Sequence, residues 1–219
     1  MSEKLWSDVD MYLEGALIGD DPVLEATRKA SRAAGLPDIA VSPTQGKLLH
    51  LMARMIGARR ILEVGTLGGY SAIWLARVLR SDGELITLEY DPKHADVARS
   101  NIKNAGFADR VTVITGAAID TLPTLGGLFD FSFIDADKKS NPDYFQWALK
   151  LSRQGSVIVI DNVVREGRVI EADSNDANIE GIRRLNTMIA AEPRVSATAI
   201  QTVGVKGYDG LAIALVIAD

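Results

Sequence analysis

The sequence predicts an α/β fold in which a mostly parallel, seven-stranded sheet carries helices on both faces. From residue 60 onward, short apolar and β-branched segments alternate with segments of helical spacing, which is typical of parallel strands joined by right-handed crossovers. A glycine-rich turn directly follows the first of these strands. The last two strands have no helix between them, which predicts an antiparallel carboxy-terminal hairpin.

The composition limits the class of protein. The chain has 219 residues, of which 47% are hydrophobic and 24% charged, and this suits one globular domain at 1–219. A net charge of −5 with both signs interspersed argues against nucleic acid as a partner. The lack of cysteine excludes disulfides, thiolate metal sites and thiol nucleophiles.

The sequence also gives no sign of a membrane or secreted protein. No apolar run approaches the roughly 18 residues that span a bilayer. The amino terminus has neither the apolar core of a signal peptide nor an arginine-rich transit pattern. We therefore expect a cytoplasmic protein without a membrane partner.

A cap of three helices is predicted at 1–57, before an α/β core at 58–219. The first helix is marked by apolar residues at helical spacing. The second and third helices start at Asp21-Pro22 and Ser42-Pro43, since proline is favoured at the first helical position. We expect them at 5–17, at 22–34 and from 43 onward. Most of their residues should serve packing, but 41–45 enter a helix just before the first strand and can lie near its carboxyl end.

In the core, strands and helices are recognised by their different apolar periods. We expect parallel strands at 61–64, 84–90, 111–115, 129–135 and 157–161. Helices are expected at 72–79, 92–105, 118–125, 141–151 and 179–191. The hairpin strands are expected at 195–203 and 211–218, with a loop at 204–210. Ligands of such sheets bind beyond the carboxyl ends of the strands.

The glycine turn predicts a nucleotide-like cofactor. Glycine lets a ligand approach bare backbone, and the free N–H groups of the following helix offer hydrogen-bond donors. The order Glu63-x-Gly65-x-x-Gly68-Gly69 differs from the Gly-x-Gly-x-x-Gly of dinucleotide sites. Glu89 ends the second strand, where an acid can hold a ribose diol. A plain βα connection explains the glycines equally well, but the two acids favour a ligand.

Oxygen ligands follow two further strands. Asp135, Asp137 and Lys138 come after one strand, and Asp161 and Asn162 come at the end of the next. Two carboxylates and an amide form an oxygen-only set suited to Mg²⁺, Ca²⁺ or Mn²⁺. Helix capping or pairing with neighbouring lysines is the alternative for either cluster alone. Their occurrence together favours a metal.

Three blocks of sequence resemble a known family. Residues 61–71 (ILEVGTLGGYS), 133–138 (FIDADK) and 161–163 (DNV) are similar to those of small metal-dependent O-methyltransferases that use S-adenosylmethionine, the catechol and caffeoyl-coenzyme A type. The likeness covers nearly all the chain and is greatest to the bacterial branch. It implies a Rossmann-like methyltransferase fold, a small aromatic dihydroxy substrate of the catechol type, and a homodimer.

The resemblance also implies roles for individual residues. The methionine end of the cofactor would be held by Glu63, Gly65, Thr66, Ser71 and the backbone near Val41. Glu89 would bind the ribose hydroxyls, and Ala118 and Asp137 would lie against the rest of the adenosine. The metal ligands would be Asp135, Asp161 and Asn162, with Mg²⁺ the first expectation. Lys138 occupies the position of the catalytic base, although a free lysine titrates near ~10.4 and must be made neutral to act.

The chain departs from the family at the predicted substrate pocket. Asn141 stands where plant enzymes have a tyrosine, and Arg165 replaces their tryptophan. An acidic substrate ligand of the animal catechol enzyme has no clear counterpart near Asp209. Arg165, Glu166 and Arg168 could form a lid over the substrate or simply a solvated loop.

Two other functions agree less well with the sequence. A nicotinamide-dependent oxidoreductase is disfavoured by the missing Gly-x-Gly-x-x-Gly and by the hairpin. A non-catalytic cofactor-binding protein is disfavoured because Lys138 and the metal set are present. His50 and His94 are expected to be structural, as are Trp74 and Trp147, which have apolar neighbours on helices.

Overall fold

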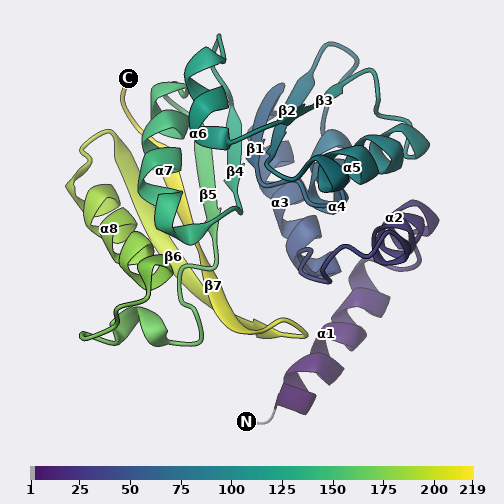
Figure 1. Ribbon diagram of the computed structural model, residues 1–219, viewed down its shortest axis with the longest axis horizontal. Coiled ribbons are helices and arrows are strands. Elements are labelled where there is room, and N and C mark those ends of the chain that lie inside the picture. Colours follow the sequence, from purple (N-terminus) through teal and green to yellow (C-terminus); the bar gives the residue numbers. More distant parts are fainter. Residues whose placement is uncertain (1–2) are drawn as a thin grey trace.

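The computed structural model describes residues 3–219 and confirms the predicted α/β fold (Figure 1). The strands are β1 (Arg60–Val64), β2 (Glu84–Glu89), β3 (Val111–Thr115), β4 (Phe131–Ile134), β5 (Val157–Asp161), β6 (Val195–Gly204) and β7 (Gly207–Val216). They form one sheet in the order β3-β2-β1-β4-β5-β7-β6. β1 to β5 pair in parallel, whereas β7 is antiparallel to both of its neighbours.

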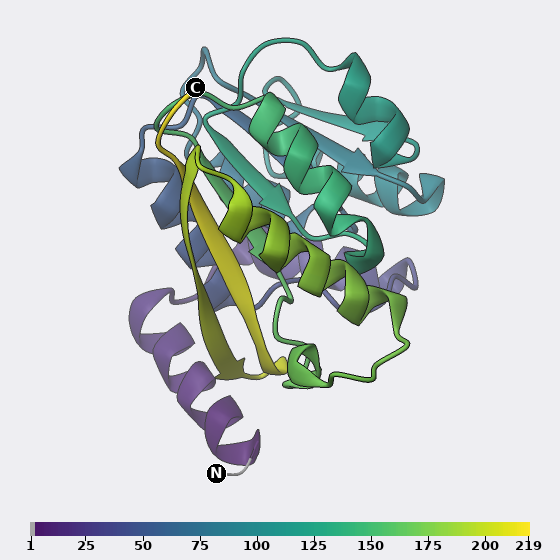
Figure 2. The ribbon, with the colours of Figure 1, turned by 90° about the vertical axis from the view of Figure 1, so that its left-hand side faces the viewer.

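Helices cover both faces of this sheet (Figures 1 and 2). They are α1 (Glu3–Leu17), α2 (Pro22–Ala33), α3 (Pro43–Met55), α4 (Tyr70–Ala76), α5 (Pro92–Asn104), α6 (Ala118–Thr121), α7 (Asn141–Lys150) and α8 (Ala177–Ala191). One buried cluster joins the sheet to α2, α3, α4 and α5. A second joins the opposite face to α6, α7 and α8.

The two clusters explain why the central strands read as continuous apolar runs. Successive side chains of a strand point to opposite faces, so Ile61 packs in the first cluster and Leu62 in the second. Phe133 and Ile134 divide in the same way on β4. Burial on both faces is the normal state of a parallel sheet. The carboxyl ends of β1, β2, β4 and β5 therefore meet at one edge above a rigid core.

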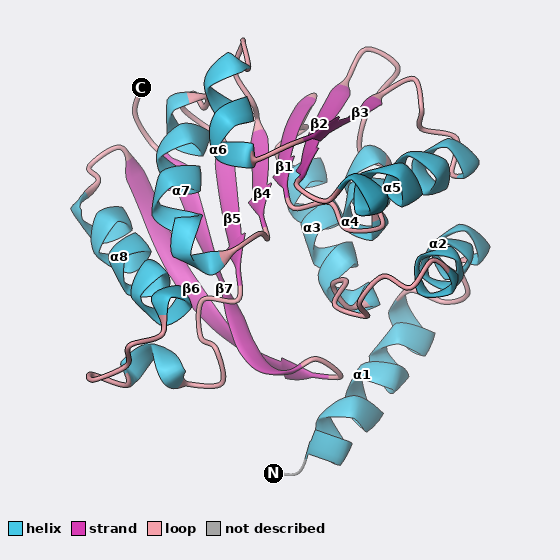
Figure 3. Cartoon of the chain, viewed as in Figure 1, coloured by secondary structure: helices cyan, strands magenta, loops and turns pink. Residues whose placement is uncertain are grey.

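The amino-terminal helices attach to this core unevenly. Asp21 caps α2 by accepting a hydrogen bond from the Leu24 amide. The same carboxylate forms two hydrogen bonds with Arg77, just after α4, at 2.5 and 3.0 Å. In contrast, α1 buries none of its residues and lies at the edge of the molecule (Figure 3). No helix within residues 3–219 combines the length and apolar character needed to cross a bilayer.

Most predicted bounds lie within three residues of the observed ones, and two elements, α6 and β7, differ by more. The helix expected at 118–125 ends as α6 at Thr121 and continues as a 3-10 turn, Leu122–Thr124, because Pro123 has no amide hydrogen for an α-helical bond. The loop expected at 204–210 is only the two-residue turn 205–206, and β7 begins at Gly207. Gly210 lies within β7, where a Cβ would collide with the Ile200 carbonyl of β6, so the glycine serves a close strand contact.

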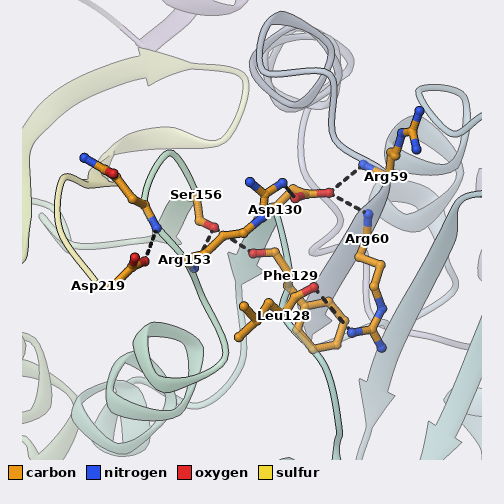
Figure 4. A network of polar contacts seen from close by, with 9 residues as sticks. Arg59, Arg60, Leu128, Phe129, Asp130, Arg153, Ser156 and Asp219 are labelled. Atoms are coloured by element: carbon orange, nitrogen blue, oxygen red, sulfur yellow. Dashed lines mark hydrogen bonds and ion pairs between the residues drawn. The ribbon is translucent and has the colours of Figure 1, made fainter.

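A polar network secures the opposite edge of the sheet, where the parallel strands begin (Figure 4). The Asp130 carboxylate accepts hydrogen bonds from the amides of Arg59 and Arg60 at 2.8 and 2.9 Å and pairs with the Arg153 guanidinium. The Ser156 hydroxyl donates to the Phe129 carbonyl at 2.8 Å. These contacts join the starts of β1, β4 and β5 and leave the carboxyl edge free for function.

Candidate active site

The glycine turn after β1 has the backbone that the sequence suggested. Gly65 has a φ of +97°, and a Cβ there would collide with the carbonyl of Asp135 at the end of β4. Only glycine therefore allows these two strand ends to lie so close. Gly69, with a φ of +82°, occupies the N-cap position of α4. The turn thus brings the start of α4 to the same edge as Asp135.

The Glu89 carboxylate at the end of β2 stabilises this turn through hydrogen bonds to its backbone. Its Oε2 accepts hydrogen bonds from the amides of Thr66 and Leu67 at 3.1 and 2.7 Å. Its Oε1 accepts one from the Asp91 amide at 3.0 Å, and the His94 ring nitrogen lies 3.6 Å away. The acid predicted to bind ribose is therefore also a structural support of the turn.

Glu63 is a fully buried carboxyl group on β1. Its Oε2 accepts a hydrogen bond from the Thr87 hydroxyl at 2.5 Å, and no described residue makes a hydrogen bond to Oε1. Burial raises the pKa of Glu63 to about 7; the charges of Asp135 and Glu89 act in the same direction, and the nearby hydroxyls of Ser71 and Thr87 offset this only in part. Such a half-satisfied buried acid marks a position where a ligand is expected.

Lys138 and Asp135 form an ion pair at the end of β4. The 3-10 turn Lys138–Ser140 buries the lysine and directs its Nζ to Asp135 Oδ1 at 2.7 Å. Asp137 points elsewhere, since its carboxylate accepts hydrogen bonds from Ser140 and Tyr144, both at 2.6 Å. Desolvation acts to raise the pKa of Asp137, but these two hydrogen bonds together with the charge of Lys139 lower it overall.

Asp161 faces the same region from the end of β5. Its Oδ2 accepts a hydrogen bond from Gln45 of α3 at 2.6 Å, and its Oδ1 accepts one from the Asn162 amide at 2.8 Å. Burial and, secondarily, the charge of Asp135 raise the pKa of Asp161. Asn162 has a left-handed backbone with a φ of 57°, a conformation that asparagine tolerates better than most residues.

These oxygen ligands are chemically suited to a divalent cation. Asp135 and Asp161 are close enough for the charge of one to raise the pKa of the other, and a cation would relieve that repulsion. Within residues 3–219, no group of three or more His, Cys, Asp or Glu side chains could hold a metal. A cation here would therefore need an amide such as that of Asn162 beside the two carboxylates, which is the predicted set.

The loop after Asn162 is fastened by Asp209. Arg165 and Glu166 have left-handed φ values of 53° and 58°. Asp209 Oδ1, on β7, accepts hydrogen bonds from the amides of Val164 and Arg165 at 3.0 and 2.9 Å. Asp209 thus supports the loop. The Arg168 guanidinium lies 3.1 Å from the Asp176 carboxylate.

The remaining predicted residues lie in or next to α3, α4, α6 and α7. Val41 is buried in the core beside α3, Ser71 lies in the first turn of α4, and Ala118 is the first residue of α6. Asn141 is fully buried, and neither polar atom of its side-chain amide has a hydrogen-bond partner among the described residues. His50 is buried, with its Nδ1 3.1 Å from the Trp74 carbonyl, which agrees with the expected structural role.

Sequence reasoning did not single out Gln45, Thr87 or the loop-fastening role of Asp209. A signal existed for Thr87, because it is a polar residue in a strand that is otherwise apolar until its final acid. Gln45 lies in the segment expected near the first strand, but its contact with Asp161 joins positions 116 residues apart. Nothing in the local sequence marks Asp209 as the support of residues 164–165.

Comparison with known proteins agrees with this geometry. The family model described as O-methyltransferase matches residues 15–217. The catechol O-methyltransferase of Mycobacterium tuberculosis (strain ATCC 25618 / H37Rv) is 58% identical over 210 residues, which are 95% of each chain.

Two solved structures superpose closely on the chain. One is the O-methyltransferase from Bacillus cereus in complex with SAH, with a TM-score of 0.97, 57% identity and coverage of 98% of this chain and 100% of that one. The other is TomG from Streptomyces achromogenes, involved in tomaymycin synthesis, in complex with SAM; its TM-score is 0.96 at 50% identity, and each chain is covered fully. The family match and these likenesses show that the chain belongs to the O-methyltransferase family.

Proposed function

We propose that this O-methyltransferase transfers the methyl group of S-adenosylmethionine to one hydroxyl of a catechol-type aromatic substrate, assisted by a divalent cation. The hydroxyl oxygen bonds to the methyl carbon, the carbon–sulfur bond breaks to leave S-adenosylhomocysteine, and the hydroxyl proton is lost. The observation that carries the proposal is the meeting of a half-satisfied Glu63 with the Asp135–Lys138 pair and Asp161 at one sheet edge. The names of the relatives support the substrate class.

The cofactor would lie along the glycine turn. Glu63, Gly65, Thr66, Ser71 and the backbone at Val41 would hold its methionine end. Glu89 would bind the ribose hydroxyls with lone pairs not used by the turn, and Ala118 and Asp137 would flank the adenosine. Holding two reactants in line removes roughly 7–11 kcal/mol of the barrier to a bimolecular reaction, so orientation is the main contribution of these residues.

The cation would be held by Asp135, Asp161 and Asn162, with Mg²⁺ expected first and Ca²⁺ or Mn²⁺ as alternatives. When bound, it would act as a Lewis acid that lowers the pKa of the substrate hydroxyl. Gln45 would orient Asp161, because its amide already holds one oxygen of that carboxylate.

Lys138 is proposed as the general base that accepts the hydroxyl proton at Nζ. Only a neutral amine can accept a proton, and the Asp135 carboxylate lies 2.7 Å from Nζ. A cation bound to Asp135 would compete with Lys138 for the negative charge of that carboxylate. A buried amine that loses its anionic partner favours the neutral form, which is the form a base requires.

We also propose that the protein is a homodimer formed through α1 and β6. α1 leaves Leu5, Val9 and Tyr12 exposed, and the edge strand β6 leaves Ile200 and Val203 exposed. Asp10 of α1 accepts a hydrogen bond from the Val205 amide at the tip of the hairpin, at 2.8 Å, so the two surfaces are adjacent. A second copy of this apolar surface is a suitable cover, as in the symmetric interfaces of most soluble oligomers.

Methyl transfer from S-adenosylmethionine to a panel of catechols, including caffeic acid and its esters, tests the reaction. We expect transfer with Mg²⁺, none after chelation, and recovery when Mg²⁺ is restored. Transfer that survives thorough chelation would contradict the metal role of Asp135, Asp161 and Asn162. Binding of the cofactor without transfer to any catechol would instead contradict the proposed acceptor class.

A further inference from the structure

Thr87 connects two parts of the proposed cofactor site. It lies on β2 directly beside Glu63 of β1 in the sheet register, and both residues are fully buried. The Thr87 hydroxyl oxygen is 2.5 Å from Glu63 Oε2 and 2.5 Å from the hydroxyl oxygen of Thr66 in the glycine turn. Three side chains from two strands and the turn are thus joined through one oxygen atom.

The chemistry of a hydroxyl group sets the direction of these hydrogen bonds. The Thr87 hydroxyl has a single hydrogen, and an ionised Glu63 can only accept, so Thr87 donates to Glu63 and Thr66 must donate to Thr87. The Thr66 amide is in turn held by Glu89. Glu63 Oε2 therefore has a fixed donor, whereas Oε1 has no partner among the described residues.

We infer that Thr87 is a positioning residue for the cofactor: it orients Glu63 so that Oε1 accepts a hydrogen bond from the ammonium group of the cofactor's amino-acid part. The inference rests on the proposed function, since it presumes S-adenosylmethionine as the ligand. A cationic donor suits Oε1 because charge-assisted hydrogen bonds are stronger than neutral ones. Burial raises the pKa of Glu63 to about 7 and so disfavours its anionic form, whereas an ammonium group at Oε1 would favour that form.

Two ligands separate this role from a purely structural one. S-Adenosylhomocysteine carries the amino-acid part, whereas 5′-methylthioadenosine keeps the adenosine and lacks that part. Calorimetry on the full chain should show that Thr87→Val weakens binding of S-adenosylhomocysteine about tenfold, as for the loss of one hydrogen bond in a charged network. The affinity for 5′-methylthioadenosine should not change. Thr87→Ser, which keeps the hydroxyl, should bind both ligands like the wild type.

Thr27→Val is a matched control, because Thr27 is also buried but its hydroxyl bonds only within α2, to the Val23 carbonyl. It should bind both ligands normally. In a Glu63→Gln background, Thr87→Val should add little further loss, since Thr87 acts through Glu63. If Thr87→Val does not fold, Thr87→Cys has a similar shape and only a weak donor, and allows the same comparison.

Equal weakening of both ligands, or of neither, would overturn the positioning role. So would a full additional loss in the Glu63→Gln background. These results differ from failure of the proposed function itself, in which the wild-type protein would bind neither S-adenosylhomocysteine nor S-adenosylmethionine.

Discussion

Lys138 is the residue on which the chemistry depends most directly. It is buried and held by Asp135 within one short turn, whereas its neighbour Lys139 is exposed. We predict that Lys138→Met lowers kcat about 10²- to 10⁴-fold, the usual contribution of a general base. Binding of S-adenosylhomocysteine should remain at the wild-type level, because Lys138 is not among the proposed cofactor residues.

Lys139→Met is the matched control for this experiment and should keep normal turnover. Single-turnover rates and calorimetric binding measure the two effects separately. Unchanged turnover in Lys138→Met would remove the assignment of the base. A parallel loss of cofactor affinity would show instead that the substitution disturbs the turn as a whole.

Gln45 is the second residue whose role a single substitution can test. Its amide is a partner of Asp161 Oδ2, and residues that orient metal ligands typically contribute 10- to 100-fold, as an order of magnitude, to metal affinity or activity. We predict that Gln45→Leu raises the Mg²⁺ concentration needed for half-maximal activity about 10- to 100-fold. Gln146→Leu, on the exposed side of α7, should leave the Mg²⁺ titration unchanged. A normal titration in Gln45→Leu would show that Asp161 needs no such support.

At the scale of elements, the loop after β5 depends on the hairpin. One oxygen of Asp209 on β7 accepts hydrogen bonds from the backbone of this loop, and the left-handed Glu166 is also held by its amide, which donates to the Tyr208 carbonyl at 3.1 Å. We predict that Asp209→Ala lowers the free energy of unfolding by about 1–3 kcal/mol, the cost of leaving buried donors without a partner. Cleavage within residues 162–168 under limited proteolysis should also become faster.

Asp209→Asn keeps an oxygen acceptor and should lie between the wild type and Asp209→Ala in both measurements. A loop that remains resistant to protease in Asp209→Ala would show that packing alone maintains it. In that case the hairpin would support the sheet but not the site.

The network at the opposite edge of the sheet predicts a pH dependence of stability. Desolvation acts to raise the pKa of Asp130, but hydrogen bonds from Arg60, Arg59 and Arg153 outweigh it, so the pKa is lowered from 3.8. A carboxylate with a lowered pKa in the folded state stabilises the fold above its unfolded pKa, and the contribution is lost as the pH falls through the folded value.

Asp130→Asn should therefore be less stable than the wild type at pH 7, by about 1–3 kcal/mol. The difference should shrink as the pH falls below 3.8. Urea unfolding of both proteins across this range measures it. A difference that stays constant with pH would mean that the contribution of Asp130 does not depend on its charge.

At the scale of the whole molecule, the exposed apolar residues of α1 make assembly testable. Light scattering should give the mass of two chains for the wild type. Val9→Glu should shift the protein toward the monomer, because a charge buried without a partner in an apolar interface is strongly unfavourable. Lys103→Glu changes charge on the exposed side of α5, at the other end of the sheet from β6, and should leave the dimer intact. A monomeric wild type would contradict the proposed interface.

The sequence by itself determined the order and type of the elements and the residues that end them. Apolar periodicity, proline and glycine act on neighbouring residues, so strands such as β3 and β5 could be predicted to the residue. The predicted acids Glu63, Glu89, Asp135 and Asp161 follow from the same reasoning, because parallel strands must present their carboxyl ends at one edge.

Only the tertiary structure decided which side chains meet across that edge. Thr87 supports Glu63 because of the register between β1 and β2, and Gln45 reaches Asp161 because the fold brings the start of α3 to the end of β5 across 116 positions of sequence. The loop of the hairpin is shorter than predicted because Gly210 serves a close contact between β6 and β7 and not a turn. Local sequence carries no information on such pairings, since their energy comes from packing between segments that are distant along the chain.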